Sequence, residues 1–353
     1  MERALRLAER GRGRTTPNPI VGAVVVTAAG VVVGQGAHLQ AGGPHAEVIA
    51  LDQAGRLARG ATLYCTLEPC SHTGRTGPCV DRIIAAGVSR VVMATRDPNP
   101  RVAGGGAGAL RAHGIEVREG VAEAEAQRQN APFFRWIVEH RPFVTIKAAA
   151  SADGFVGRPG ERVGITGPEA DRFFHQQRAA IDAIAVGSGT LLADDPLLTA
   201  REAYRFRPLT RVIFDWRLRV PPGARVWSTL EAGPVIMMVS RRAVAERPEA
   251  AASLERAGAV IVSFDSRDLA PMLTDLAARD VMWLLVEGGP SLHAEFFKAG
   301  LVDHVQLAVS SHVLEGGVPL QLGDLPGGSW DRPTRIAPLG KDVLVEFDVH
   351  RPY

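Results

Sequence analysis

One stretch decides the fold of the first half of this chain: Thr66-Leu67-Glu68-Pro69-Cys70-Ser71-His72-Thr73-Gly74-Arg75-Thr76-Gly77-Pro78-Cys79, read with His45-Ala46-Glu47 upstream. Its two cysteines and the upstream histidine are sulfur and nitrogen ligands that Zn²⁺ prefers. Three protein ligands leave the fourth tetrahedral position open for water, whose pKa the metal lowers toward neutrality. We therefore expect His45, Cys70 and Cys79 to bind a catalytic Zn²⁺, with Glu47 moving protons between that water and a leaving amine.

The order of these residues matches the signature of zinc deaminases, in which a His ligand and a non-ligating Glu precede a Pro-Cys pair and a second Cys. Eight residues separate Cys70 from Cys79, a longer loop than the Cys-x-x-Cys spacing of nucleic-acid deaminases. The alternatives are a pair of buried thiols or a closed structural zinc site, with His72 or His38 as the fourth ligand. Neither has a use for a carboxylate two residues after the histidine, which favours the open catalytic site.

The length and the net charge of the chain limit the classes of protein to which it can belong. A chain of 353 residues is long for one core and suits two domains. Forty Lys and Arg side chains against 38 Asp and Glu leave a formal net charge of +2, so no overall field gathers a polyanion and nucleic-acid binding gains no support. Three cysteines are too few for a disulfide framework, which indicates a reducing cytoplasm. Cys65, in a predicted strand interior, is expected to be an inert core thiol.

The N-terminus imitates a secretory signal, because Arg-rich residues 1–14 precede an uncharged run from Ile20 to Gly36. Two prolines stand ahead of that run, and Ala28-Ala29-Gly30 divides it into two β-branched pieces. Such pieces bounded by turn residues are a strand signal, so we expect a β-hairpin of residues 20–27 and 31–36. No other run is long enough to span a bilayer, and no membrane partner is expected.

Strands alternate with helices along both halves of the chain, which predicts two α/β layered domains. Around Val138 to Pro142 the pattern breaks at a polar, proline-stopped segment, and we place the boundary there, giving domains of residues 1–140 and 141–353. In the first half we expect helices at 2–11, from 45, at 80–86 and at 121–131, and a short helix between the loop at 104–106 and the strand near 115. We expect strands at 62–66, 90–94 and 115–117. In the second half we expect strands at 143–149, 183–186, 211–214, 234–239, 259–264, 283–286, 303–309 and 342–349, and helices at 168–179, 243–259, 269–278 and 291–299.

Several motifs of the first half carry a resemblance: the stretch from Thr66 to Cys79, Thr16-Pro17-Asn18-Pro19-Ile20-Val21-Gly22, Gly36-Ala37-His38, Gly42-Gly43-Pro44-His45-Ala46-Glu47 and Asp97-Pro98-Asn99-Pro100. They resemble the deaminase half of the RibD family of bifunctional riboflavin biosynthesis proteins. The resemblance implies a cytidine-deaminase-like α/β/α fold and a small-molecule substrate, 2,5-diamino-6-(5-phosphoribosylamino)pyrimidin-4-one, whose 2-amino group leaves as ammonia.

The resemblance also implies a substrate pocket beside the metal. Asn18, His38, His72 and Arg75 match family positions that line the pyrimidine and phosphate pocket. Their chemistry suits it, because Asn can pair with both edges of a base and Arg can fork onto a phosphate. Without the resemblance, Asn18 between two prolines is a turn residue and Arg75 a solvated charge.

The second half resembles the reductase of the same family, whose fold is similar to dihydrofolate reductase. The matching stretches are Phe143 to Gly154, Ile165-Thr166-Gly167, Gly187 to Thr199 and Val286-Glu287-Gly288-Gly289-Pro290-Ser291-Leu292. The resemblance implies hydride transfer from NADPH that opens the ribosyl group and reduces it to ribityl. In the last stretch a strand ends, two glycines follow and a helix begins. The glycines permit a ligand to approach the backbone closely, so the N-terminus of this helix suits a pyrophosphate. No Gly-x-Gly-x-x-Gly follows a strand, which argues against a Rossmann site.

We expect Lys147, Asp194 and Glu287 to be the catalytic polar groups of the reductase, since each ends an apolar strand or helix. The resemblance implies a cofactor site of Ala150, Gly164, Thr190, Asp194, Trp216, Gly288, Gly289, Pro290, Ser291 and Leu292, and a substrate site of Arg162, Arg178, Leu198, Arg201 and Glu287. Gly164 and Trp216 depart from the family pattern at the nicotinamide end.

For several of these residues the alternative is a structural role without a ligand. Asp194 could be a helix cap or turn residue, and Arg178 and Arg201 could form exposed salt bridges. Ser240-Arg241-Arg242, directly after a strand, is a candidate reader of the extra phosphate of NADPH. The glycine-rich run 104–108 lacks the Lys of a P-loop and is predicted to be a plain loop.

Two other classes of function compete with this interpretation. A single-stranded nucleic-acid or nucleoside deaminase with an accessory domain shares the metal chemistry, but a nucleic-acid enzyme needs a basic groove with aromatic stacking platforms. This chain has 6% aromatic residues and nearly balanced charge. A non-catalytic, zinc-stabilised binding protein would not need Glu47. We further expect a homo-oligomer, as is common for multi-domain enzymes of small molecules.

Overall fold

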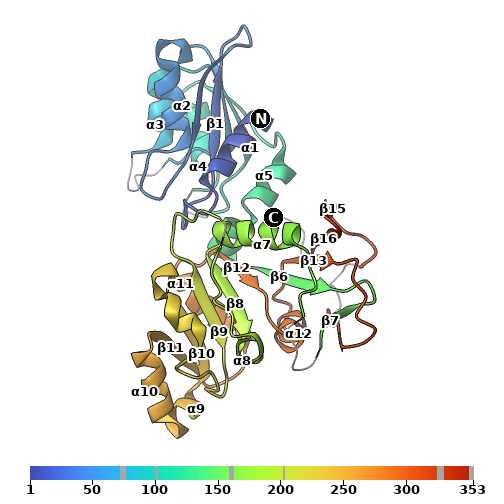
Figure 1. The fold of residues 1–353 in the computed structure, drawn as a ribbon. Coiled ribbons are helices and arrows are strands. Elements are labelled where there is room, and N and C mark those ends of the chain that lie inside the picture. The colour runs from blue at the N-terminus through green and yellow to red at the C-terminus, as the bar shows by residue number, and fades with distance from the viewer. Residues whose placement is uncertain (72–76, 100–101, 159–162, 202, 324–329, 350–353) are drawn as a thin grey trace. The chain divides into compact units, whose positions relative to one another are not determined.

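The structure, a computed structural model, describes residues 1–71, 77–99, 102–158, 163–201, 203–323 and 330–349 (Figure 1). Two compact units divide the chain, one from Met1 to His140 and one that begins at Arg141. Within the described ranges no helix has both the length and the apolar character needed to cross a membrane. Three predicted site residues, His72, Arg75 and Arg162, lie outside the described residues.

The first unit is built on a mixed sheet. Its strands are β1 (Gly22–Val26), β2 (Val32–Ala37), β3 (Thr62–Leu67), β4 (Arg90–Thr95) and β5 (Glu116–Arg118), and its helices are α1 (Glu2–Ala8), η1 (Glu9–Gly11), α2 (Ala46–Ala54), η2 (Gly55–Ala58), α3 (Cys79–Ala86), α4 (Gly105–Ala112), α5 (Glu123–Gln129) and α6 (Ala131–Glu139). Among the described residues the strand order is β2-β1-β3-β4-β5. The antiparallel pairing of β1 with β2 confirms the predicted hairpin, and β3, β4 and β5 run parallel.

Close packing of α2 on the hairpin positions the start of that helix. A Cβ atom at Gly36 of β2 would lie 2.2 Å from the carbonyl oxygen of Ala46, at the first turn of α2. Only glycine permits this backbone approach. The first turn of α2, which carries Glu47 and is preceded by His45, is therefore held directly against the sheet.

Three predictions for the first unit were wrong in detail. The run 104–108 is not a plain loop, because α4 begins at Gly105. Glu68, buried at the end of β3, accepts hydrogen bonds from the amides of Gly104 and Ala107, both at 3.0 Å. A carboxylate at a helix N-terminus satisfies its free N–H groups and stabilises it.

The helix expected at 121–131 is two helices, α5 and α6, that meet at Asn130. The side chain of Asn130 pairs with the backbone N–H and C=O of Ile20, each at 2.9 Å. The helix expected at 2–11 becomes a 3₁₀ turn after Ala8. The contact of Asn130 with Ile20 thus divides the helix expected at 121–131, and helix propensity alone does not indicate this division.

The second unit is built on a larger, mainly parallel sheet. Its strands are β6 (Phe143–Ala150), β7 (Phe155–Gly157), β8 (Ala183–Gly187), β9 (Thr210–Phe214), β10 (Val235–Ser240), β11 (Ala259–Phe264), β12 (Trp283–Val286), β13 (His304–Val309), β14 (Val318–Pro319), β15 (Arg335–Leu339) and β16 (Asp342–Asp348), and its helices are α7 (Pro168–Ala180), α8 (Ser188–Asp194), η3 (Arg225–Ala232), α9 (Arg241–Glu246), α10 (Pro248–Arg256), α11 (Leu269–Ala278) and α12 (Pro290–Lys298). In the described part the order is β11-β10-β9-β8-β12-β6-β13-β16-β15, with β7 and β14 paired separately. The strands from β11 to β13 run parallel, and β16 and β15 add an antiparallel edge.

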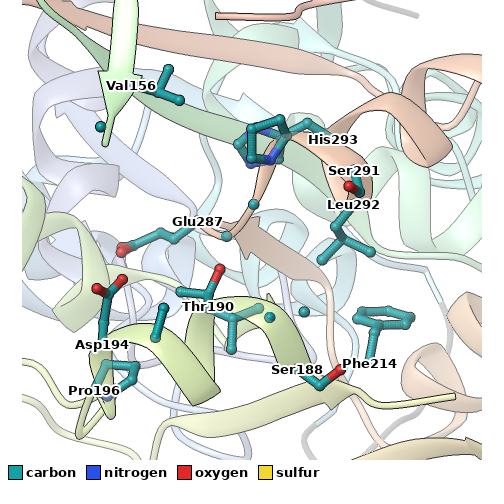
Figure 2. A pocket seen from close by; sticks show the side chains of 18 of the residues that line it. Val156, Ser188, Thr190, Asp194, Pro196, Phe214, Glu287, Ser291, Leu292 and His293 are labelled. Atoms are coloured by element: carbon teal, nitrogen blue, oxygen red, sulfur yellow. The ribbon is translucent and has the colours of Figure 1, made fainter. Parts of the chain in front are cut away.

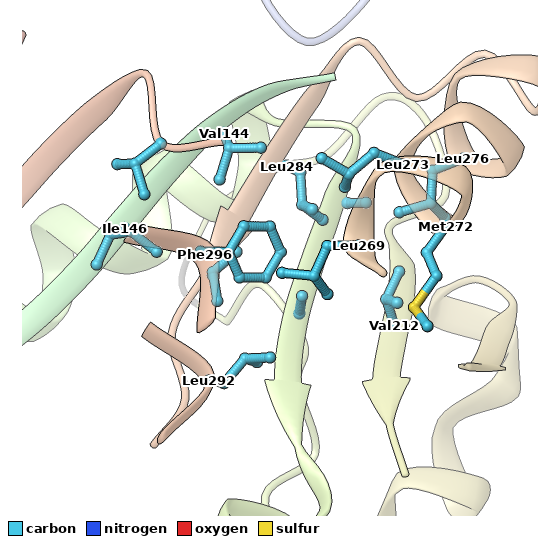
Figure 3. Close-up of a cluster of buried hydrophobic side chains, with 14 of the residues drawn as sticks. Val144, Ile146, Val212, Leu269, Met272, Leu273, Leu276, Leu284, Leu292 and Phe296 are labelled. Atoms are coloured by element: carbon cyan, nitrogen blue, oxygen red, sulfur yellow. The ribbon is translucent and has the colours of Figure 1, made fainter. Parts of the chain in front are cut away.

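One face of this sheet carries a hydrophobic core under α11 and α12. Figure 3 shows Val144 and Ile146 of β6 on that face, together with Phe296 of α12. Because side chains alternate along a strand, Lys147 lies on the opposite face. There its Nζ atom is 4.5 Å from the ring centroid of Phe174 in α7. The alternation of side chains along β6 thus places the Lys147 ammonium on the face of the sheet opposite this hydrophobic core.

The single helix predicted over the Ala-rich region 243–259 was also wrong. The region holds α9 and α10, and β11 begins at Ala259. Arg247 between the two helices has φ −134° and ψ 54°. Pro248 has no N–H to continue α9, and its fixed φ suits the first position of a new helix.

A charged cluster joins β13 to β16 in the second unit. His304 Nδ1 lies 2.8 Å from Asp348 Oδ1, and its Nε2 lies 3.5 Å from Glu346 Oε1. Burial lowers the pKa of His304, but the two carboxylates outweigh burial and raise it to about 9. Since this folded-state pKa exceeds the unfolded value of about 6.5, the stabilisation is complete below that value and is lost as the pH rises toward 9.

We expect His304→Gln to lower the free energy of unfolding by about 1 to 3 kcal/mol at pH 6 and by much less at pH 10. Urea unfolding of the full chain, followed by circular dichroism at the two pH values, measures the difference. His113→Gln, which changes an exposed histidine that contacts a backbone carbonyl of its own helix, is the control and should show no such pH dependence. An equal destabilisation by His304→Gln at both pH values would contradict the role of the charge.

Candidate functional site

The three predicted metal ligands converge at the ends of three elements. His45 precedes α2, Cys70 follows β3 and Cys79 opens α3. His45 Nδ1 lies 3.6 Å from Cys70 Sγ and 3.0 Å from Cys79 Sγ, and the three ligand atoms all lie within 4.8 Å of one another. Two ligands on one tetrahedral Zn²⁺ are about 3.5 Å apart, given the usual Zn–N and Zn–S bond lengths. The donor set and its spacing therefore fit Zn²⁺.

The electrostatics of the Cys70 thiol also suit a metal. The Cys79 thiol and His45 hold the pKa of the Cys70 thiol down, to about 4, against the effect of burial. The backbone N–H of Cys79, at the start of α3, donates to Cys70 Sγ over 3.4 Å. Thiolates are the form that binds metals, and a helix N-terminus favours them.

Glu47 faces this cluster with an unused oxygen. Its side chain is buried, 4% exposed, and Oε2 has no hydrogen-bond partner among the described residues. Burial raises the pKa of this carboxyl. A buried polar atom without a partner is costly unless a bound group satisfies it. Water at the open fourth position of the metal would be such a group.

Asn18 and His38 lie next to the metal cluster. His38 Nδ1 is 3.1 Å from the carbonyl oxygen of Pro44, which can only accept, so Nδ1 carries the proton. His38 Nε2 is then free to accept from Asn18 Nδ2, at 3.0 Å. The rings of His38 and His45 meet edge to face, with centroids 5.4 Å apart. Because both His38 nitrogens have partners, this residue is not the fourth ligand of a closed site.

The second unit has a cavity of about 1090 Å³ at the carboxyl ends of its parallel strands. Figure 2 shows Thr190 and Asp194 of α8 opposite Glu287, which follows β12. The predicted residues that line the cavity are Lys147, Gly164, Arg178, Thr190, Asp194, Leu198, Arg201, Trp216, Glu287, Gly288, Gly289, Pro290, Ser291 and Leu292. Ala150 is the exception: it is 3% exposed, does not line the cavity, and its carbonyl accepts from Ser310 N–H at 2.8 Å.

The turn between β12 and α12 is held close to the neighbouring strand. A Cβ atom at Gly288 would lie 2.8 Å from Val186 Cβ and 2.9 Å from Thr190 Oγ1. Glycine is required here because any larger residue would push the turn away from β8 and α8. The N-terminus of α12 therefore opens into the cavity beside Thr190.

Charged groups meet at the inner end of the cavity. Glu287 accepts a bidentate pair of hydrogen bonds from Arg178, whose Nε lies 2.7 Å from Oε1. Burial raises the pKa of Glu287, but Arg178 and Lys147 outweigh it and lower the pKa. The pKa of Lys147 is lowered, chiefly by burial. Arg178 also donates to the carbonyl of Thr199 over 3.1 Å, so it is held in place rather than exposed to solvent.

Comparison with known proteins matches a segment in each half of the chain to a family model. Residues 142–327 match the model of the RibD C-terminal domain, and residues 1–95 match the cytidine and deoxycytidylate deaminase zinc-binding region. The riboflavin biosynthesis protein RibD of Aquifex aeolicus is 40% identical over 353 residues, covering 98% of this chain and 97% of that protein. RibD of Escherichia coli is 40% identical over 343 residues, covering 93% and 90%.

The chain belongs to the RibD family. Among solved structures, RibD of Acinetobacter baumannii matches with a TM-score of 0.85 at 34% identity, covering 98% of this chain and 97% of that one. A deaminase/reductase from Thermotoga maritima matches with a TM-score of 0.84 at 35% identity, covering 99% and 97%. The predicted family is thus confirmed, as is the pairing of a zinc-binding, cytidine-deaminase-like domain with a RibD reductase domain.

Two histidines of this RibD family member escaped prediction from the sequence: His293, which lines the cavity, and His175, which does not line it but contacts two residues that do. His175 of α7 lies between Arg178 and Arg201, and its Nδ1 accepts from the Arg201 N–H over 3.2 Å. His293 of α12 is 6% exposed, and its Nε2 has no partner among the described residues. Burial lowers the pKa of His293 to about 4, which keeps the ring neutral. His175 and Arg178 are three residues apart, a spacing that puts both on one side of a helix. This spacing was the sequence signal that could have indicated His175.

The candidate phosphate reader Ser240-Arg241-Arg242 does not line the cavity, although the backbone N–H of Ser240 donates to the carbonyl oxygen of Trp216, which does. Ser240 caps α9 by accepting from Ala243 N–H at 2.9 Å. Arg241 pairs with Asp265 at 3.3 Å and Arg242 with Glu246 at 2.6 Å. None of the three lines the cavity and both arginines have acidic partners, so the phosphate-reading role of this segment stays a prediction.

Proposed function

We propose that this chain deaminates 2,5-diamino-6-(5-phosphoribosylamino)pyrimidin-4-one and then uses NADPH to reduce the ribosyl group of the product to ribityl. The observation that carries the proposal is the unpartnered Glu47 Oε2 beside the His45, Cys70 and Cys79 cluster. Family membership supports the presence of both activities on one chain, since the chain carries both a deaminase and a reductase domain.

The first reaction exchanges one C–N bond for one C–O bond. Zn²⁺ held by His45, Cys70 and Cys79 would supply a water of lowered pKa at C2 of the pyrimidine. Glu47 takes a proton from that water and delivers it to the amino group that leaves as ammonia. Asn18 and His38 hold the pyrimidine ring beside these groups, with the neutral His38 oriented by Pro44. His72 and Arg75 stay predictions for the same pocket.

The second reaction adds one hydride and one proton to the ribosylamino group. NADPH, held at the N-terminus of α12 and by Thr190 and Asp194, would supply the hydride. Lys147 supplies the proton, because burial lowers its pKa and makes the ammonium a better donor. Arg178 and Arg201 hold the substrate phosphate, while Glu287 orients Arg178 through their bidentate contact.

Metal removal tests whether the two sites are independent. We expect chelation of the full chain to stop ammonia release but to leave NADPH oxidation on the deaminated intermediate within about 2-fold of its starting rate, since zinc serves only the first reaction. Ammonia and the absorbance of NADPH are followed separately, with zinc re-addition as the control. Loss of both activities in a chelated protein of unchanged circular dichroism would contradict the independence of the sites.

A homo-oligomeric state, a cytoplasmic location and the absence of nucleic-acid binding are part of this proposal. The near balance of charge supports the last of them, because a polyanion site needs a clustered positive surface.

A further inference from the structure

A buried hydrogen-bond acceptor without a partner lies in the wall of the cavity. His293 is the fourth residue of α12, is 6% exposed, and lines the cavity together with Glu287 (Figure 2). Its ring donates a hydrogen bond to the backbone carbonyl of Val286, while Nε2 has no partner among the described residues. The proton of the neutral ring is therefore on Nδ1, and Nε2 can only accept. A buried acceptor that stays unpaired costs free energy, so this atom indicates a missing donor.

The register of the sheet brings Lys147 to the same place. Val286, which holds the His293 ring, ends β12 and pairs with Ile146 of the neighbouring parallel strand β6. Lys147 is the next residue of β6, and it lines the same cavity. Burial is the main cause that lowers the pKa of His293, and the charge of Lys147 lowers it further. An unused acceptor and a cationic donor therefore lie close together at the carboxyl end of β12.

The Lys147 side chain has unused donors. In the part of the chain that the structure describes, its ammonium forms no hydrogen bond or ion pair, and its contact is with the Phe174 ring, whose centroid lies 4.5 Å from Nζ. An ammonium has three N–H donors and no acceptor. One hydrogen bond from Lys147 to His293 Nε2 would satisfy a group on each side, and the flexible four-carbon stem of lysine permits the move.

The other charged groups that act on Lys147 are poor donors to His293. Burial chiefly lowers the pKa of Lys147, and the charges that act on it besides are those of Glu287, Arg178 and Asp171. The two carboxylates have no proton to donate. Arg178 donates two hydrogen bonds to Glu287 and is held there. Lys147 is thus the cation that is free to donate to His293.

A second unpaired acceptor, on the next strand, provides a comparison. Gln306 of β13 pairs with Lys147 in the sheet, and its Oε1 has no partner among the residues described. Its amide nitrogen donates to Glu346 of β16 over 2.8 Å, and the residue does not line the cavity. Because Gln306 is held by the strand on its far side, His293 is the better placed acceptor for Lys147.

We propose that His293 is a positioning residue of the reductase reaction, whose Nε2 accepts a hydrogen bond from the Lys147 ammonium and directs its other N–H groups into the cavity. The inference rests on the proposed reductase function, in which Lys147 is the proton donor, and deepens it. A hydrogen bond accepted from an ammonium favours its charged form, so this contact opposes the effect of burial on Lys147.

Ionisation of Lys147 can be measured directly, because the chain has three lysines, Lys147, Lys298 and Lys341. Nuclear magnetic resonance of the full chain, labelled with ¹³C at lysine Cε, follows each one as the pH rises. We expect His293→Leu, which keeps the bulk but removes the acceptor, to raise the acid dissociation constant of Lys147 by about 10-fold and to leave the other two lysines unchanged. His293→Gln restores an acceptor and should stay within about 3-fold of wild type. Gln306→Leu is the control and should not change Lys147.

The same variants are compared in NADPH oxidation on the deaminated intermediate. His293→Leu should lower kcat at pH 7 by about 10-fold, change KM by less than about 3-fold, and shift the loss of activity at high pH to a lower pH, since Lys147 then loses its proton more readily. His293→Gln should recover most of kcat and of the pH profile. Ammonia release should be unchanged in every variant.

An unchanged ionisation of Lys147 in His293→Leu overturns the proposal, and so does a lower kcat with an unmoved pH profile, which is the mark of a purely structural role. An equal change in Gln306→Leu also overturns it, since Gln306 would then be the acceptor. If His293→Leu does not fold, His293→Asn, whose shorter amide keeps a donor for Val286 but does not reach the position of Nε2, should show the same differences from His293→Gln. Wild-type protein in which Lys147 responds to His293 but which oxidises no NADPH overturns the proposed reductase function, and the role in that reaction with it.

Discussion

Glu47→Gln should keep its zinc and lose ammonia release by a factor of about 10² to 10⁴, the range contributed by a positioned general base. Glutamine has nearly the same shape and can occupy the same buried site, but it cannot accept a proton from water. The carboxylate is suited to that role because Oε2 is buried and unpartnered beside the three ligand atoms. Ammonia release and bound zinc, measured on the same protein, give the two readouts.

A second buried carboxylate near the metal provides the control. Glu68, 3% exposed, stands two residues before Cys70, but its oxygens accept backbone N–H groups at the start of α4. Glu68→Gln should therefore destabilise the first unit by about 1 kcal/mol and affect turnover far less than Glu47→Gln. Unchanged ammonia release in Glu47→Gln would remove Glu47 from the mechanism, and loss of zinc would assign it a structural role instead.

Lys147→Ala should lower NADPH oxidation on the deaminated intermediate by about 10²-fold or more without changing ammonia release. We propose the ammonium as the proton donor of the second reaction, since Lys147 lines the cavity and burial lowers its pKa. Stopped-flow absorbance of NADPH and a separate ammonia assay measure the two activities.

Lys298→Ala is the matched control for this variant, because Lys298 ends α12 but is exposed and does not line the cavity. It should behave as wild type in both assays. Equal loss of both activities in Lys147→Ala would indicate a general folding defect and contradict the assignment. Normal NADPH binding with slow oxidation would separate a role in chemistry from one in cofactor affinity.

Interactions between distant residues account for most errors made from the sequence. Glu68 converts a glycine run 36 residues away into a helix start, and Asn130 divides a predicted helix by binding Ile20, 110 residues earlier. Ala150 ends the strand β6 but does not line the cavity. For the glycine run and the divided helix, local propensity was outweighed by a contact that depends on the folded chain.

The sequence by itself determined the metal centre and the family, because both depend on residue types at fixed short spacings. A histidine, a carboxylate two positions later and two cysteines around a Pro-led loop specify the chemistry before any folding is considered. Tertiary structure alone decided that Arg178 pairs with Glu287, 109 residues away, and that Arg217 and Arg219, but not Arg241 or Arg242, line the cavity. Which charges meet depends on strand order and on the packing of helices across the sheet, and no short spacing encodes either.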